Sequence, residues 1–306
     1  MVRWAAAAGL ALLVAGCGAP ALEPPPAARS GRLLVRTNGA AALVALPGGG
    51  LRFGELGGRV RDVGATGTVR DVLRLRVASG GQRGLLGLAI DAQRRTFAAY
   101  VQRSGQRRIV VARIAPGRRR LVWRGPPSTD LADGGHLAFA PDGRLTIGIG
   151  DLQDHAAVAD PRSVNGKLLT LDPAGPPGQR PRLLSGGWNN PFAFAWTADG
   201  RLWVADNSAG SAPERVARAD PGGRRAPLRE LRRHTAPSGL AALGPDELAL
   251  CGFVSHRLTR LVLAPGAAPR LDPTPLATDC ALGVVRLTDG RIAYATRRAI
   301  LVLPAP

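Results

Sequence analysis

The stretch Pro141-Asp142-Gly143-Arg144-Leu145-Thr146-Ile147-Gly148 joins a tight turn to a short apolar run. Gly accepts a positive φ angle and Asp caps its own turn, so Asp-Gly pairs are typical of hairpins. Similar turns precede apolar runs at 198–201, 244–247 and 288–291, although the one at 244–247 contains Pro-Asp. Counted from Asp to Asp, the four turns lie 57, 47 and 43 residues apart. Repeats of roughly 40–50 residues are typical of β-propeller blades.

Short apolar runs bounded by Gly, Pro or Asp continue this pattern along the chain, as strands do. They occupy 32–36, 72–77, 108–114, 144–148, 201–205, 247–250, 260–263, 291–294 and 298–303. No stretch of 32–306 shows helical periodicity with caps at both ends. Dividing the 275 residues of 32–306 by the repeat gives about six blades. We therefore expect an all-β, six-bladed β-propeller, each blade a four-stranded antiparallel sheet, with 33–35 closing the ring. An array of β-sandwiches is the structural alternative, but its repeats are normally longer.

The N-terminus precedes the expected propeller and has the anatomy of an export signal. Arg3 is followed by thirteen apolar residues at 4–16 and then by Cys17, too short a run for a membrane-spanning helix. The order Val14-Ala15-Gly16-Cys17 resembles a bacterial lipobox. We expect a signal at 1–16, acylation of Cys17, and a Pro/Ala-rich tether at 17–31. The protein would then be exported and lipid-anchored at the outer face of the bacterial cytoplasmic membrane or in the cell envelope. The alternative is an ordinary secretory signal with an incidental Cys.

The net charge of +19 is carried almost wholly by Arg, since Lys167 is the only Lys. Nucleic acid is not the expected partner, because the chain is exported, only 4% of residues are aromatic and the Arg residues are scattered. Anionic lipids or polymers of the envelope are the more suitable partners, and a plain solvated surface is the simpler interpretation. With Cys17 acylated, Cys251 and Cys280 form an even pair in an oxidising compartment. They are either a disulfide or two buried thiols.

Two segments resemble a known family. They are Gly81-Gln82-Arg83-Gly84-Leu85-Leu86-Gly87-Leu88-Ala89 and Ala132-Asp133-Gly134-Gly135-His136-Leu137-Ala138-Phe139, the latter followed by Gly148-Ile149-Gly150-Asp151. Together they resemble the quinoprotein glucose/sorbosone dehydrogenases, soluble sugar oxidases that carry pyrroloquinoline quinone (PQQ) on a six-bladed β-propeller. Segments at 165–172, 187–196, 234–240 and 285–290 extend the resemblance over nearly all of 32–306.

The resemblance implies a set of site residues and two cofactors, PQQ and Ca²⁺. Gln82 and Asn190 match residues of the pocket, and Asp151 matches the residue that orients the catalytic His. His234 begins a segment that resembles a later pocket motif. Asn189 stands where the family has a cofactor-binding Arg, and Ala132 where it has the catalytic His. The Ca²⁺-binding loop is not recognisable at 206–209, so we assign no metal ligand.

Two other His residues are candidates for the missing proton acceptor. Strand alternation directs His136 and Ala138 to one face of their strand, so His136 is a candidate base. The alternative is a strand-edge His that hydrogen-bonds to a turn. His155, in the polar loop Asp151-Leu152-Gln153-Asp154-His155, either lines the pocket or is part of a solvated loop.

These observations leave two hypotheses for the function. In the first, the protein is an oxidoreductase that acts on the CH–OH groups of sugars. In the second, it is a non-catalytic propeller that binds an envelope glycan, an anionic polymer or a protein. We expect a monomer that reaches the membrane only through its lipid anchor.

Overall fold

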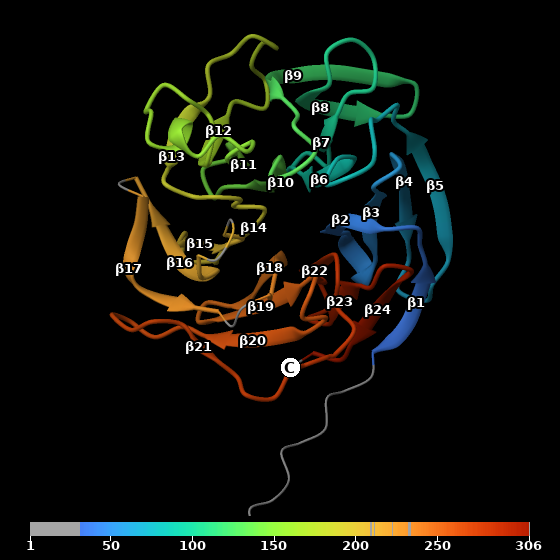
Figure 1. Ribbon diagram of the computed structural model, residues 1–306. Coiled ribbons are helices and arrows are strands. Elements are labelled where there is room, and N and C mark those ends of the chain that lie inside the picture. The colour runs from blue at the N-terminus through green and yellow to red at the C-terminus, as the bar shows by residue number, and fades with distance from the viewer. Residues whose placement is uncertain (1–30, 209, 211, 222, 232–233, 306) are drawn as a thin grey trace, which may run out of the picture.

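The computed structural model describes residues 31–305, apart from 209, 211, 222 and 232–233. Its strands form six four-stranded antiparallel sheets arranged as blades in a ring (Figure 1). The six-bladed propeller expected from the turn spacing is confirmed. The predicted signal, Cys17 and the tether as far as residue 30 lie outside the described residues. Within the described residues, no helix has the length and apolar character needed to cross a membrane.

The strands follow one another from the inside of each blade to its outside, and the first strands of neighbouring blades contact one another around the ring. Blade 1 contains β2 Ala40–Ala45, β3 Leu51–Glu55, β4 Arg59–Val63 and β5 Val69–Arg74. Blade 2 contains β6 Leu85–Ile90, β7 Thr96–Val101, β8 Arg108–Ala115 and β9 Arg118–Pro127. Blade 3 contains β10 Gly134–Phe139, β11 Leu145–Ile149, β12 Lys167–Leu171 and β13 Arg182–Ser185.

Blade 4 contains β14 Ala193–Trp196, β15 Leu202–Asp206, β16 Arg215–Asp220 and β17 Gly223–Glu230. Blade 5 contains β18 Pro237–Gly244, β19 Glu247–Gly252, β20 Leu258–Val262 and β21 Arg270–Leu271. Blade 6 contains β22 Gly283–Arg286, β23 Ile292–Ala295, β24 Ala299–Leu303 and the N-terminal β1 Arg32–Arg36. Two single-turn 3₁₀ segments, η1 Pro47–Gly49 and η2 Ala156–Val158, are the helical elements of the described chain.

The ring closes by joining the two ends of the chain. β1 pairs antiparallel with β24, with Arg32 opposite Val302 and Arg36 opposite Ala299. The first strand of the sequence is thus the outermost strand of the last blade, as the expected closure at 33–35 requires. One expected strand is displaced: β5 begins at Val69 and ends at Arg74, whereas we expected 72–77. Beyond Arg74 the chain passes to blade 2, where Val77 forms an isolated bridge with Gln102.

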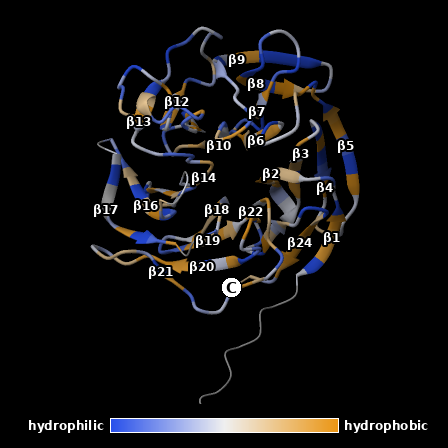
Figure 2. Ribbon diagram, in the orientation of Figure 1, coloured by the Kyte–Doolittle hydropathy of each residue, from blue (hydrophilic) through white to orange (hydrophobic). Residues whose placement is uncertain are grey.

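The hydrophobic core is divided among the blade interfaces. Each of the six buried clusters draws its side chains from two neighbouring blades, so the apolar faces are covered by the next sheet around the ring. β7, β11, β12 and β15 are buried along their whole length. This explains their continuous apolar sequences, since both faces of each strand are covered. The outer strands β1, β5 and β17 carry hydrophilic segments along the circumference (Figure 2).

The two faces of the ring differ in their connections. The Asp-Gly turns link the first and second strands of a blade, and they lie on one face, which we call the turn face. On this face, Arg side chains bridge neighbouring blades. Arg201 donates to the Pro245 carbonyl of blade 5 at 2.9 Å, and Arg291 of blade 6 donates to the Gly49 carbonyl of blade 1 at 3.0 Å. The loops that enter the first strands lie on the other face, which we call the loop face.

Candidate functional site

A polar cavity of about 470 Å³ opens on the loop face, and we call it the Asp151 cavity. Its walls come from the loops before β6, β10 and β14, the loop after β11 and the loop after β15, so blades 2, 3 and 4 contribute. Its lining residues are Gln82, Leu131, Ala132, Asp151, Gln153, His155, Asn189, Asn190, Asn207 and Ser208. The structure therefore brings together Gln82, Asp151, Asn189 and Asn190, which the sequence had placed in one site.

Asp151 is the organising residue of this cavity, and it is 1% exposed. Its position after β11 depends on Gly150, where an added Cβ would lie 1.8 Å from the Ala132 carbonyl oxygen. One carboxylate oxygen, Oδ1, accepts the Gln153 N–H at 3.0 Å. The other, Oδ2, accepts the Asn189 side-chain amide at 2.6 Å. Asp151 is thus held in one orientation by the loops of two blades.

His155 completes a carboxylate–imidazole pair. Its Nδ1 atom contacts Asp151 Oδ2, while its side chain is 63% exposed. The buried partner fixes the ring, and the exposed ring faces the cavity that both residues line. A carboxylate that holds one imidazole nitrogen leaves the other available for proton transfer. The sequence offered a weak signal for this pair, because His155 and Asp151 are four residues apart in one polar loop, but it did not show that the loop turns inward.

A second buried carboxylate supports the neighbouring wall. Asp206, at the end of β15, is 1% exposed. It accepts the backbone N–H groups of Asn189 at 3.0 Å and Asn190 at 2.9 Å. Burial raises the pKa of Asp206, while these hydrogen bonds oppose that shift. The Oδ1 atom of Asn190 is buried and accepts no hydrogen bond from the described residues.

Ala132 lies on the rim, where the family resemblance places a catalytic His. Its φ angle is +53°, and its N–H donates to Gln82 Oε1 at 2.8 Å. Its carbonyl accepts the Leu152 N–H at 3.3 Å. The loop before β10 is therefore closely bound to its neighbours, but the methyl group of Ala132 provides no proton acceptor.

Two His candidates lie elsewhere. The ring of His136 packs edge-on against Phe194 with centroids 4.7 Å apart, at the interface of blades 3 and 4, and His136 is not among the residues that line the Asp151 cavity. Burial lowers the pKa of His136 to about 4, so the ring is neutral near pH 7. His234 lines a separate cavity of about 710 Å³ beside blade 5. Their assigned roles, as base and cofactor contact, stay predictions.

The two body cysteines form a disulfide. Cys251 at the end of β19 is bonded to Cys280, with Cα atoms 5.6 Å apart. Both residues are fully buried. The bond ties blade 5 to the segment that leads into β22, far from the Asp151 cavity in sequence, and we assign it no part in the site.

The residues of the Asp151 cavity do not fit PQQ. A flat cofactor that carries several carboxylates is bound best by cationic side chains, which pair with its negative groups. No Arg or Lys occurs among the described residues that line the cavity, and its only acidic lining residue is the buried Asp151. Nor does the described part of the chain contain a group of three or more His, Cys, Asp or Glu side chains that could hold a metal ion. Amides, hydroxyls and a carboxylate are instead the groups that bind neutral hydroxyl-rich molecules.

The fold is a six-bladed propeller with a polar cavity on its loop face, and comparison with known proteins identifies its family. The family model described as Glucose / Sorbosone dehydrogenase matches residues 38–212. The chain therefore belongs to the glucose/sorbosone dehydrogenase family. No curated protein shows significant similarity to the chain.

Solved structures share this fold. A putative oxidoreductase (glucose dehydrogenase) from Thermus thermophilus is 26% identical, with a TM-score of 0.76, over 89% of this chain and 99% of that one. The PQQ-bound aldose sugar dehydrogenase from Streptomyces coelicolor is 23% identical, with a TM-score of 0.75, over 91% and 99%. The soluble aldose sugar dehydrogenase from Escherichia coli, in its apo form, is 19% identical, with a TM-score of 0.74, over 90% and 99%.

Proposed function

We propose that this protein is an oxidoreductase that acts on the CH–OH groups of a sugar bound in the Asp151 cavity. The observation that carries the proposal is the contact between the buried Asp151 carboxylate and the exposed His155 ring. Membership of the glucose/sorbosone dehydrogenase family supports the reaction class. The amide and hydroxyl groups of the lining support a neutral, hydroxyl-rich substrate.

In the cavity, some residues bind the substrate and others transfer its proton. The amide and hydroxyl groups of the lining, such as those of Asn207 and Ser208, bind the substrate hydroxyls. Asp151 holds the His155 ring, and His155 accepts the hydroxyl proton, while the hydride of the same carbon would pass to a two-electron acceptor, a quinone or dye supplied from outside the chain. General-base catalysis of this kind contributes roughly 10²–10⁴ in rate. The substituted position, Ala132, explains why the imidazole must come from the loop after β11.

A second candidate function is sugar binding without oxidation. It is favoured by the lack of Arg and Lys among the described lining residues, because a site without cations is poorly suited to the anionic quinone of the family. In this candidate the cavity retains an envelope glycan, and His155 and Asp151 bind its hydroxyls. Both candidates share the exported, lipid-anchored location that Cys17 predicts, which we include in the proposal.

The test measures sugar-dependent dye reduction and, separately, sugar binding by calorimetry, over a panel of aldoses, with and without added PQQ and Ca²⁺. His155→Asn is compared with His256→Asn, which changes an exposed His outside the cavity. We expect the first variant to lower turnover by about 100-fold or more and the second to leave it unchanged. Binding without turnover in the unaltered protein would select the second candidate. If no sugar binds, both candidates are wrong.

A further inference from the structure

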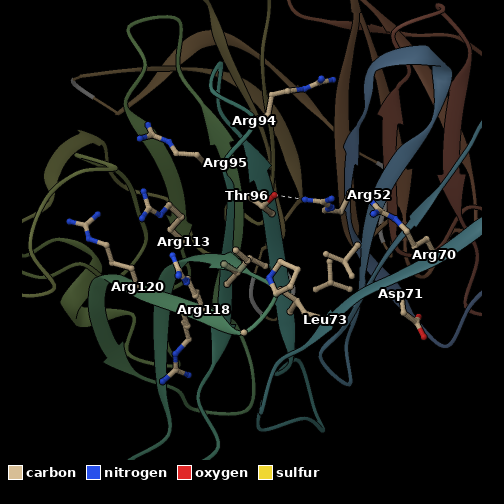
Figure 3. A pocket seen from close by; sticks show the side chains of 17 residues that line it. Arg52, Arg70, Asp71, Leu73, Arg94, Arg95, Thr96, Arg113, Arg118 and Arg120 are labelled. Atoms are coloured by element: carbon tan, nitrogen blue, oxygen red, sulfur yellow. Dashed lines mark hydrogen bonds between the residues drawn. The ribbon is translucent and has the colours of Figure 1, made fainter.

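A second concave region, larger than the Asp151 cavity, shares no lining residue with it. It is a groove of about 980 Å³ between blades 1 and 2, and we call it the Arg groove. One wall comes from β5 and Arg52 of blade 1, and the other from the turns after β6 and β8 (Figure 3). Among the described residues that line it, eight are Arg and one is an acid, Asp71. These Arg residues are Arg52, Arg70, Arg94, Arg95, Arg113, Arg118, Arg119 and Arg120.

Part of this cationic lining is structural. Arg52 donates to both carboxylate oxygens of Asp62, at 2.6 and 2.9 Å, and to Thr96 of blade 2. Arg120 donates to the Gly175 carbonyl of blade 3 at 3.0 Å. Arg95 pairs with Asp91. These contacts hold the walls of the groove and use up much of the hydrogen-bonding capacity of those guanidinium groups.

Other Arg side chains of the groove make no described contact that holds its walls. No hydrogen bond or ion pair in the described residues involves the side chains of Arg94, Arg113 or Arg118. Arg94 and Arg118 are exposed, and Arg113 is partly buried. Asp71, the one lining acid, is already held by Arg59 outside the groove, at 2.7 Å. The groove thus has an excess of positive charge that no protein group neutralises.

We propose that the Arg groove is a binding site for phosphate groups of an anionic envelope component. Guanidinium groups bind phosphate oxygens through paired N–H donors, and several of them around one concavity favour a ligand with more than one negative charge. The floor between them is formed by apolar side chains such as Leu73 and Ile114, which lowers the local dielectric and strengthens each contact. This ligand is anionic, whereas the sugar proposed for the Asp151 cavity is neutral.

The location of the groove agrees with an envelope ligand. The turns after β6 and β8 lie on the turn face. β1 also begins on that face, because Arg32 pairs with Val302, and Leu303 pairs with Ile292, directly after the turn at 287–291. The chain therefore enters the propeller on the same face as the Arg groove, and the Asp151 cavity opens on the other.

The phosphate group has two possible sources, a soluble polymer and a lipid headgroup, and two probes distinguish them. One is short-chain inorganic polyphosphate, measured by calorimetry. The other is a set of phosphatidylcholine vesicles with and without phosphatidylglycerol, measured by co-sedimentation. The groove variant is Arg94→Gln/Arg113→Gln/Arg118→Gln in the full chain. The control is Arg76→Gln/Arg103→Gln/Arg162→Gln, which removes the same charge from exposed positions on the loop face.

We expect the groove variant to bind at least one probe about tenfold more weakly or worse, since hydrogen bonds to charged groups are the strong ones. The control should bind as the unaltered protein does, and thermal unfolding should be the same for all three proteins. Loss with polyphosphate alone identifies a soluble ligand, and loss with anionic vesicles identifies a headgroup. Equal weakening in groove and control variants, or no binding of either probe, would overturn the proposal.

Discussion

The Asp151 cavity and the Arg groove differ in how their charged side chains are buried and hydrogen-bonded. At the cavity, the carboxylates of Asp151 and of Asp206, which lies behind the wall, are removed from water and are satisfied by backbone and side-chain amides. In the groove, guanidinium groups gather at the surface, and three of them have no described partner. A buried charge is costly unless it is fully hydrogen-bonded, whereas an exposed cation is inexpensive and available for binding. The cavity is therefore a rigid site, and the groove combines rigid walls with free charges.

The largest effect is expected at the buried carboxylate behind the cavity. Asp206→Ala removes the acceptor for the N–H groups of Asn189 and Asn190, and unsatisfied buried donors are expensive. We expect a loss of about 3–5 kcal/mol in the free energy of unfolding, measured in urea. Asp206→Asn keeps an acceptor oxygen and should lose much less. A small loss in both variants would show that the wall does not depend on this residue.

The second effect separates the two kinds of Arg in the groove. Arg52→Ala breaks a partly buried pair with Asp62 and the contact with Thr96, so we expect a loss of about 2–3 kcal/mol. Arg118→Ala removes a side chain without a described partner and should change stability by less than about 0.5 kcal/mol. Urea unfolding of both variants is the measurement. Equal losses would contradict the distinction between Arg side chains that hold the groove walls and Arg side chains without a described partner.

The third effect concerns pH on the cavity side of blade 3. Burial lowers the pKa of His136 from 6.5 to about 4, so the unfolded chain takes up a proton first as the pH falls. The neutral His136 ring therefore makes its full contribution to stability above pH 6.5, and this contribution is lost progressively toward pH 4. We expect the unaltered protein to lose about 1–2 kcal/mol more than His136→Gln between about pH 7 and pH 5. Parallel pH profiles for the two proteins would show that His136 is not protected from water.

The smallest effect tests the backbone in both regions. Ala132 in the cavity has a φ angle of +53°, and Arg94 in the groove has one of +61°. This region is unfavourable for L-residues other than Gly by roughly 1–2 kcal/mol, while Gly costs roughly 0.5–1 kcal/mol in chain entropy. Ala132→Gly and Arg94→Gly should each raise stability by about 0.5 kcal/mol, seen as a small rise in Tm. The opposite sign is expected for Ala99→Gly inside β7, where the strand needs no positive φ.

Most of the fold, but only part of the site, could be predicted from the sequence. The propeller follows from local turn chemistry, because each Asp-Gly turn fixes a hairpin without help from distant residues. The grouping of Gln82, Asp151 and Asn190 was accessible through the family resemblance. The pairing of His155 with Asp151 was not, because it depends on a loop containing the positive φ angles of Leu152 and Gln153. The Arg groove could not be predicted either, since its two walls come from different blades, which only the packing of blade 1 against blade 2 brings together.

The pairing of β1 with β24 has a consequence for folding during synthesis. The strand made first has its partner among the residues made last, about 265 positions later. Until that partner emerges, β1 is an open edge that can pair with another chain, and such distant pairing is slow. A partly made chain is thus an incomplete ring with an unpaired strand edge. Conditions that delay the synthesis of the final residues should therefore cause the chain to aggregate through the unpaired edge of β1.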